Sequence, residues 1–522
     1  MRLIDRLEKY GKSDFYGFHM PGHKRREELG ITLFPNPFSV DITEIDGFDN
    51  LHHPEGILKE FMEQASDIYG ADQTYYLVNG STGGILAAVS SAVPEGKKLL
   101  MARNSHKSAY HAAMLNRIDT EYLYPEIIEN CGIQGGIEPE KLRRILEADK
   151  ENTIGAVFLT SPTYEGIVSD VKRLAEIAHE KGIPLIVDEA HGAHFPFYDG
   201  EGENRQDGRM FPRPALQCGA DIVIQSVHKT LPSLTQTAVL HLQGELADRE
   251  RLEFYLRIYQ SSSPSYVMMA SIENCIEYMA GEGKKRLEQL GEHLESWMEA
   301  AGKWRCLAML DDQVLEKNGA FDRDISKLAV GITSLGKQAG INGTALAQEV
   351  RQRFHLEPEM CCDRYVLYMT SLMDSKESLL KLLDGLTRID EELYQRVSKR
   401  SDKTDSMEKA ERTETPETPE GARERCRDGQ SVLTWTSHMT GCMSMAEAVK
   451  KKGRWIRLED ASGWVSRSFL TVYPPGVPAV VPGEMISREV SELLLKNAEL
   501  GLTVEGLDAE GRIDVVEREE KE

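Results

Sequence analysis

Long apolar runs are missing from this sequence, and none reaches the roughly 18–20 residues that a membrane-spanning helix requires. The first residues, Met1 to Lys9, mix charged and apolar side chains and contain no continuous apolar core of the kind that a signal peptide carries. We therefore expect a cytoplasmic protein with no membrane partner.

Cysteine pairs at metal-binding or redox spacing are also missing. The chain has 8 cysteines among 522 residues, and no two of them form a CxxC motif. Cys361 and Cys362 are adjacent, a spacing that suits neither a zinc site nor a disulfide framework. We expect reduced thiols and no metal site.

Basic residues are fewer than acidic residues in this sequence. The sequence has 62 Lys and Arg against 85 Asp and Glu, which gives a net charge of −23 at pH 7. A protein that binds nucleic acid needs a basic surface to neutralise the phosphates. Nucleic acid is therefore not expected as a main partner, whereas a cationic small molecule is compatible with this charge.

The length and the patterning predict several domains, because one hydrophobic core rarely serves 522 residues. The segment 401–429 is charged and almost free of apolar residues, so it is expected to be a polar linker. The other predicted parts are an N-terminal segment 1–45, an α/β large domain 46–285, a small α+β domain 286–400 and a C-terminal α+β domain 430–522.

A lysine and an acid follow two buried-type strands. Lys229 comes just after the strand Ile222–Ile224, and Asp188 ends the strand that begins at Pro184. A lysine whose pKa is lowered by desolvation can bind an aldehyde covalently, and an acid can keep a pyridine nitrogen protonated. This is the pair of groups that a pyridoxal 5'-phosphate site requires.

A glycine-rich turn, Asn79 to Gly84, separates the predicted strand 74–78 from a helix that we expect to begin near Ile85. Free backbone N–H groups and the positive end of a helix dipole favour an anion at such a turn. Neither a Walker motif nor GxGxxG is present there, so a ligand with one phosphate fits better than a dinucleotide. Ser81 and Thr82 are the candidate phosphate-binding residues.

Alternating strands and helices predict a mainly parallel sheet, in which ligands collect at the carboxyl ends of the strands. His106 stands where the strand beginning at Lys98 gives way to a helix, and an imidazole there could stack on a flat ring. The polar residues at predicted strand ends are Ser81, His106, Ser161, Asp188, Ser226 and Lys229. Their convergence is the main argument for a single site.

Several motifs together resemble the bacterial ornithine/lysine/arginine decarboxylases, pyridoxal phosphate enzymes of the aspartate-aminotransferase fold (fold type I). The motifs are His19-Met-Pro-Gly-His-Lys24, Asn79-Gly-Ser-Thr82, Arg103-Asn-Ser-His-Lys-Ser108, Asp188-Glu-Ala-His191, Ser226-Val-His-Lys229, Tyr473-Pro-Pro-Gly-Val-Pro478 and Pro482-Gly-Glu484. The resemblance covers about residues 1–400 and resumes near 430. Larger family members carry an N-terminal wing domain, and this chain resembles the shorter type.

The resemblance implies a role for each matching residue. Lys229 would hold the cofactor aldehyde, Asp188 the pyridine nitrogen, and His106 would stack on the ring with His191 beside it. The phosphate would be bound by Ser81, Thr82, Ser226 and His228. Glu484 and Tyr473 would line the substrate entrance, with Glu484 receiving the distal cation. Two subunits usually share each site in this fold, so we expect a homodimer or larger assembly in which the turn Ser261–Ser263 reaches the neighbour's phosphate.

The implied reaction converts a basic amino acid to its amine and CO₂ in polyamine biosynthesis, with arginine or lysine favoured and ornithine possible. A proton would return to Cα from Lys229 or His228. One alternative is an aminotransferase of fold type I, which needs an arginine for the α-carboxylate, and Arg364 is the candidate. A second is an inactive regulatory protein that binds pyridoxal phosphate.

Overall fold

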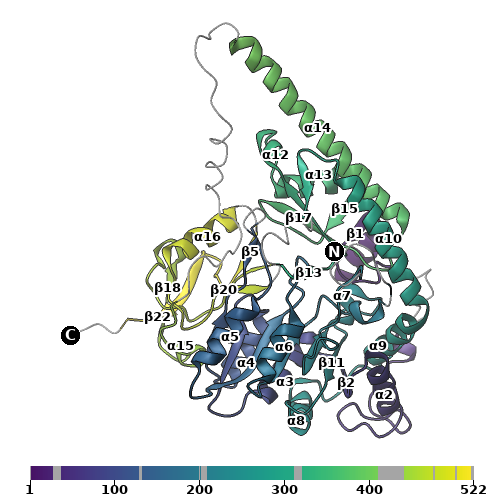
Figure 1. Ribbon diagram of the computed structural model, residues 1–522, viewed down its shortest axis with the longest axis vertical. Coiled ribbons are helices and arrows are strands. Elements are labelled where there is room, and N and C mark those ends of the chain that lie inside the picture. Colours follow the sequence, from purple (N-terminus) through teal and green to yellow (C-terminus); the bar gives the residue numbers. More distant parts are fainter. Residues whose placement is uncertain are drawn as a thin grey trace.

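The computed structural model describes residues 2–26, 37–128, 132–198, 200, 209–310, 320–408, 440–473, 476–499 and 502–518. Three parts are visible in Figure 1: a large α/β part in the lower half, a smaller part above it, and a C-terminal part drawn in yellow at its side. No helix among the described residues is both long and apolar enough to cross a membrane.

A seven-stranded sheet forms the centre of the large part. Its strands, in spatial order, are β2 (Gln73–Leu77), β11 (Ala238–Leu242), β10 (Ile222–Gln225), β9 (Leu185–Asp188), β7 (Ile154–Thr160), β3 (Lys98–Ala102) and β4 (Thr120–Leu123). Strand β11 is antiparallel to both of its neighbours, and the other printed pairings are parallel. The expected mainly parallel sheet is confirmed.

Helices cover both faces of this sheet, which explains why its strands are apolar almost throughout. Successive side chains of a strand point to opposite faces, so Ile186 packs in one core and Val187 in another. The first core includes residues of α3 (Gly80–Ala92) and the second residues of α6 (Val171–His179). The polar residues that follow each strand are left at the carboxyl edge of the sheet.

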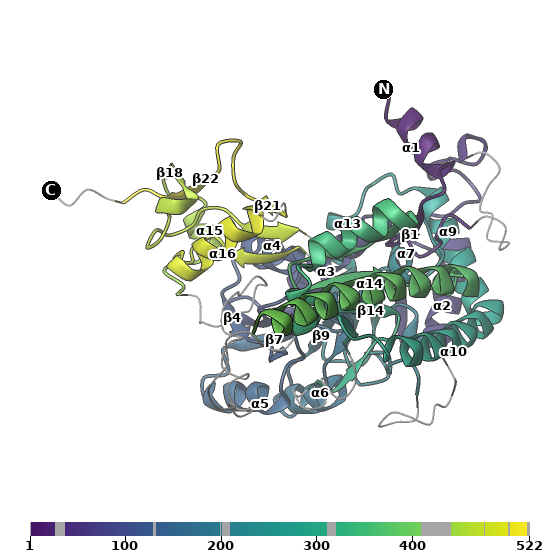
Figure 2. The ribbon, with the colours of Figure 1, turned by 90° about the horizontal axis from the view of Figure 1, so that it is seen from above.

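The small part is built on an antiparallel sheet of four strands, in the order β12 (Leu307–Met309), β14 (Lys327–Ile332), β17 (Tyr365–Met369) and β16 (Met360–Cys361). Helices α10 (Lys284–Ala301), α13 (Gly343–Phe354) and α14 (Lys376–Glu408) pack around it (Figure 2). Helix α14 continues eight residues into the predicted linker, and 409–429 lie outside the described residues.

The N-terminal segment is joined to the small part. Its helix α1 (Leu3–Gly11) is followed by β1 (Tyr16–Phe18), which pairs in parallel with β15 (Leu356–Pro358). Lys24, with only 2% of its side chain exposed, donates to the backbone oxygens of His19 and Met369 at 2.9 and 2.8 Å. The turn after β1 is thereby fixed against the small sheet.

The C-terminal part has a core of its own, formed by apolar residues between Leu458 and Val515. Its elements are α15 (Met445–Ala448), β18 (Gly453–Arg457), β19 (Leu470–Tyr473), β20 (Val477–Val480), α16 (Arg488–Glu499), β21 (Thr503–Glu505) and β22 (Arg512–Val516). It lies beside α4 (Lys107–Leu115) in Figures 1 and 2. Lys107 ties the two together, because its amide bonds Gly476 O at 3.1 Å and its Nζ bonds Glu505 at 2.8 Å.

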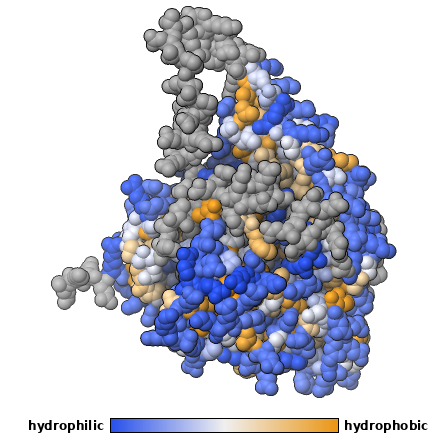
Figure 3. Space-filling view, in the orientation of Figure 1, coloured by the Kyte–Doolittle hydropathy of each residue, from blue (hydrophilic) through white to orange (hydrophobic). Residues whose placement is uncertain are grey.

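The molecular surface agrees with the composition of the chain. The face shown in Figure 3 is mostly hydrophilic, and hydrophobic residues appear on it in small scattered groups. The large apolar side chains are instead collected in the cores described above.

Candidate active site

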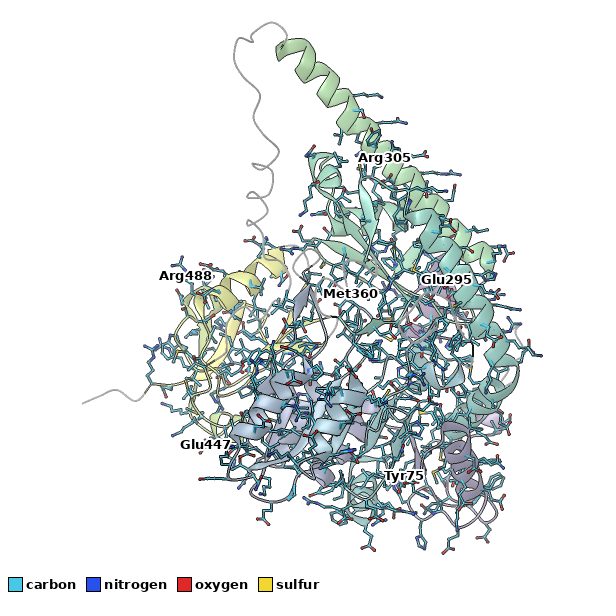
Figure 4. All side chains as sticks on the ribbon, viewed as in Figure 1. Tyr75, Glu295, Arg305, Met360, Glu447 and Arg488 are labelled. Carbon is cyan, nitrogen blue, oxygen red and sulfur yellow. The ribbon has the colours of Figure 1, made fainter. Side chains whose placement is uncertain are left out.

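A cavity of about 530 Å³ opens at the carboxyl edge of the central sheet. All three parts of the molecule contribute to its wall. Met360 of the small sheet is one of the lining residues, and Figure 4 labels it between the small part, the large part and the C-terminal part. From the C-terminal part, Val472 and Val477 reach the wall.

Lys229 and Asp188 both line this cavity. Lys229 lies on the single-turn helix α7 (Val227–Thr230), directly after β10, and Asp188 is the last residue of the neighbouring strand β9. Burial lowers the pKa of Lys229 and raises that of Asp188, while the attraction between the two charges opposes both shifts. The lysine is thus shifted toward the neutral amine that covalent chemistry needs.

His191 is in direct contact with Lys229. Its Nε2 lies 2.9 Å from the lysine Nζ. Burial, followed by the charge of Lys229, holds the pKa of His191 well below its ordinary value, so the imidazole is neutral near pH 7. A neutral imidazole can accept a hydrogen bond from the lysine, and this contact fixes the direction of Nζ.

The glycine-rich turn forms the start of α3. This helix begins at Gly80 and not near Ile85, so Ser81 and Thr82 lie in its first turn, where backbone N–H groups have no partner within the helix. Gly80 has φ +70°, a conformation that glycine adopts without strain. Ser226 Oγ donates to Ser81 Oγ at 2.9 Å and so links this turn to α7. Ser81 and Thr82 line the cavity.

His106 caps the N-terminus of α4 and lines the same cavity. Its Nδ1 lies 2.8 Å from Ser108 Oγ and accepts the Ser108 N–H at 3.3 Å, so the ring orientation is fixed. Burial and then the charge of Lys229 lower the pKa of His106 to about 3. The ring is therefore a neutral, fixed aromatic surface at physiological pH.

His228 completes the set of imidazoles at the wall. Its Nδ1 donates to Thr237 O at 2.8 Å, which leaves Nε2 as the acceptor nitrogen. Burial lowers the pKa of His228 to about 4. This residue is also neutral at pH 7.

Four polar atoms at the wall are buried and have no hydrogen-bond partner among the described residues: His191 Nδ1, Asn104 Oδ1, Thr160 Oγ1 and Asn497 Oδ1. An unsatisfied buried polar group is costly, so such groups indicate a missing polar partner. A small polar aromatic ligand with an aldehyde and a phosphate fits this set. Asn104, Thr160 and Asn497 were not predicted from the sequence, although Asn104 follows strand β3 and Thr160 ends strand β7.

The sequence model described as "Orn/Lys/Arg decarboxylase, major domain" matches residues 2–316, and "Orn/Lys/Arg decarboxylase, C-terminal domain" matches residues 430–514. The chain belongs to the Orn/Lys/Arg decarboxylase family. The resemblance based on the motifs is confirmed, and the protein is an enzyme of the pyridoxal phosphate-dependent amino acid decarboxylase class.

Curated relatives match over almost the whole chain. The arginine decarboxylase of Bacillus subtilis is 29% identical over 508 residues, which cover 97% of this chain and 95% of the relative. The constitutive lysine decarboxylase of Escherichia coli is 23% identical, covering 97% of this chain and 78% of the relative.

Solved structures support the fold. The Escherichia coli constitutive lysine decarboxylase matches with a TM-score of 0.70 at 21% identity, covering 98% of this chain and 81% of that one. The Francisella novicida lysine decarboxylase LdcF matches with a TM-score of 0.71 at 19% identity, and the match covers 98% of this chain and 80% of that one. The predicted fold type I α/β architecture is confirmed.

Glu484 of this decarboxylase is not at the cavity wall, contrary to its expected place at the substrate entrance. Its side chain is buried and forms an ion pair with Arg103, with NH2 3.0 Å from Oε2. The side chain of Tyr473 lies outside the described residues. The C-terminal part of the decarboxylase contributes Val472, Val477, Asn497 and Leu502 to the wall instead.

Two of the predicted serines lie behind the wall and not on it. Ser161 Oγ accepts the Ser169 N–H at 3.2 Å, and Ser226 is fully buried against Ser81. The turn Ser261–Ser263 lies on the exterior, where Ser261 O bonds His52 Nε2 at 2.7 Å.

Arg364, the candidate carboxylate clamp of an aminotransferase, does not line the cavity. It lies in the turn between β16 and β17, where its side chain packs beside Gly132. Lys229 is the one lysine or arginine among the described residues that line the wall.

Proposed function

We propose that this enzyme decarboxylates a basic amino acid with pyridoxal phosphate bound in the cavity at the carboxyl edge of the sheet. The observation that carries the proposal is the contact of Lys229 with His191 at 2.9 Å, beside Asp188 at the end of the adjacent strand. A lysine with a lowered pKa and a buried acid on one cavity are the two groups on which this cofactor depends.

Bound pyridoxal phosphate supplies an electron sink for the bond that breaks at Cα. Asp188 would hold a proton at the pyridine nitrogen, and burial away from water would strengthen that interaction. His106 would cover one face of the ring. The N-terminal turn of α3, with Ser81 and Thr82, would bind the phosphate, and His228 and Ser226 would complete this end of the site.

Lys229 also handles the proton that returns to Cα after CO₂ leaves. Its Nζ is held by His191. Because its pKa is lowered, Lys229 can release and take up a proton near neutral pH. His228 is the alternative donor, but its pKa of about 4 leaves it without the extra proton at pH 7. We therefore assign the step to Lys229.

The lining of the cavity favours decarboxylation over transamination. An aminotransferase must hold the α-carboxylate through both half reactions, which suits an arginine clamp. No arginine lines the described part of the wall, and Arg364 lies elsewhere. A carboxylate without such a clamp is free to leave as CO₂.

We favour arginine or lysine as substrate over ornithine, because the curated relatives that match most of this chain include arginine and lysine decarboxylases. The amine product would enter polyamine synthesis in the cytoplasm. The exposed turn Ser261–Ser263 is proposed to reach the phosphate of a second subunit in a homodimer or larger assembly.

The test is to incubate the purified protein and pyridoxal phosphate separately with arginine, lysine and ornithine, and to measure CO₂ and the amine. Release of CO₂ and the amine from one substrate supports the proposal, provided that Lys229→Ala abolishes it and the surface control Lys98→Ala retains it. Keto acid in place of CO₂ identifies an aminotransferase. Absence of a cofactor absorbance band that depends on Lys229 identifies a protein without this chemistry.

A further inference from the structure

One carboxylate at the cavity wall has no role in the chemistry described above. Glu165 lies in the turn between β7 and β8 (Ile167–Val168) and lines the cavity. The hydroxyl of Tyr365, on β17 of the small sheet, donates to its Oε1 at 2.7 Å. The side chain is thus held in a defined position by the opposite wall.

The surroundings of this carboxylate are neutral within the part of the chain that the structure describes. No lysine or arginine among the described residues lies within ion-pair distance of Glu165. Burial raises its pKa, and the groups that oppose this shift are neutral: the hydroxyls of Tyr365 and Thr163 and its own backbone. A desolvated carboxylate without a cation is costly, and a cation supplied from outside would remove that cost.

The other carboxylates near the cavity are already engaged. Asp188 is assigned to the pyridine nitrogen. Glu359 accepts the Met20 N–H at 2.9 Å and the hydroxyl of Tyr164, and it is not a lining residue. Glu484 is paired with Arg103. Glu165 is the remaining carboxylate at the described part of the wall.

Contacts along the wall connect Glu165 to the reacting end of the cavity. Lys229 touches His191, and the ring of Tyr164 packs edge-on against His191 with 4.8 Å between centroids. Glu165 follows Tyr164 directly in the chain. Lys229 and Glu165 thus line one cavity and are connected through His191 and Tyr164.

We propose that Glu165, oriented by Tyr365, receives the distal cation of the substrate and selects basic amino acids over neutral ones. The inference rests on the proposed function, because it assigns the far end of the same substrate. The ligand class is an α-amino acid whose side chain ends in an ammonium or a guanidinium. Tyr365 occupies Oε1 and thereby orients the carboxylate toward that group.

The test compares the holoenzyme with Glu165→Gln, Glu165→Asp and the control Glu121→Gln, a half-exposed residue on β4. Binding of arginine, lysine and norleucine is measured by rapid mixing, from the change in cofactor absorbance that precedes CO₂ release. Norleucine has the aliphatic chain of lysine without its amine. Because Glu165→Gln removes one partner of a desolvated charge pair, we expect affinity for the basic ligand to fall about 100-fold.

Norleucine affinity is expected to be unchanged in Glu165→Gln, and Glu165→Asp is expected to restore part of the preference for the basic ligand. Equal affinity of the wild type and Glu165→Gln for arginine and lysine overturns the inference. Equal weakening of basic and neutral ligands also overturns it, because that result indicates a structural role. These binding results decide the inference even if no CO₂ is released, an outcome that refutes the proposed reaction separately.

Discussion

Arg103, fully buried just after strand β3, donates a 3.0 Å hydrogen bond to Glu484, which lies 381 residues farther along the chain. The same guanidinium donates to Pro478 O at 2.8 Å and to the hydroxyl of Tyr110 at 2.9 Å. The side chain of Arg103, in the large part, therefore fixes the segment of the C-terminal part that places Val477 at the cavity wall.

Replacing Arg103 by methionine is expected to destabilise the enzyme by about 3–5 kcal/mol, because Glu484 remains buried without its cation. The double variant Arg103→Met/Glu484→Gln should recover part of this loss, since no uncompensated charge remains. Urea unfolding measures both effects. The control Arg143→Met, which breaks a surface pair with Glu180, should cost far less. A double variant no more stable than the single one would contradict this explanation.

The Arg103–Glu484 pair is a contact that could not be predicted from the sequence. The motif around Glu484 identified the family, but its partner is set by the docking of two distant segments, which no local pattern encodes. Lys229 and Asp188 were predicted because each follows a buried strand, and the carboxyl ends of parallel strands meet at one edge. Asn104 also follows a buried strand, but an asparagine there is equally suited to a turn, so its position alone did not indicate a role in the site.

Removing the charge of Asp188 should reduce catalysis more than stability. Asn has nearly the same shape but cannot hold a proton at the pyridine nitrogen, so we expect kcat/KM to fall roughly 10²–10⁴-fold in Asp188→Asn. Initial rates of CO₂ release measure this, and cofactor retained after dialysis is measured in parallel. Asp170→Asn, at the cap of α6, is the control. Unchanged kcat/KM would exclude the role given to Asp188.

A buried ion pair behind the site predicts a pH dependence of stability. Asp324 Oδ2 lies 2.8 Å from Lys327 Nζ, with both side chains fully buried, and Lys327 Nζ also bonds His191 O at 3.4 Å. Burial alone would raise the pKa of Asp324, but Lys327 and His194 lower it far below the ordinary value of 3.8. A depressed folded-state pKa stabilises the protein above the unfolded-state pKa, and this contribution is lost as pH falls through the folded-state value.

Asp324→Asn is therefore expected to cost about 3–5 kcal/mol at pH 7, where Lys327 is left unpaired. The difference in free energy of unfolding between the variant and the wild type should be constant down to about pH 5 and should shrink below about pH 4. Urea unfolding across this range gives the two curves. Asp508→Asn, which removes a surface partner of Arg512, is the control. If the difference in free energy of unfolding grew as the pH fell, the lowered pKa assigned to Asp324 would be contradicted.

His106 has two separable roles, as a helix cap and as a ring against the cofactor. His106→Phe keeps an aromatic surface but loses the acceptor for the Ser108 N–H, so it should lower stability by about 1 kcal/mol. His106→Asn keeps a capping oxygen but loses the ring, and stacking worth about 0.5–1.5 kcal/mol corresponds to roughly a 2- to 12-fold weaker affinity for pyridoxal phosphate.

Thermal unfolding of the unloaded protein and fluorescence titration with the cofactor distinguish these two losses. Because the pKa of His106 is about 3, its charge does not change between pH 5 and pH 8, and cofactor affinity of the wild type should show no inflection from this residue in that range. An inflection near pH 6.5 that disappears in His106→Phe would mean that the ring is protonated during binding. The ring would then act as a charge and not as a neutral stacking surface.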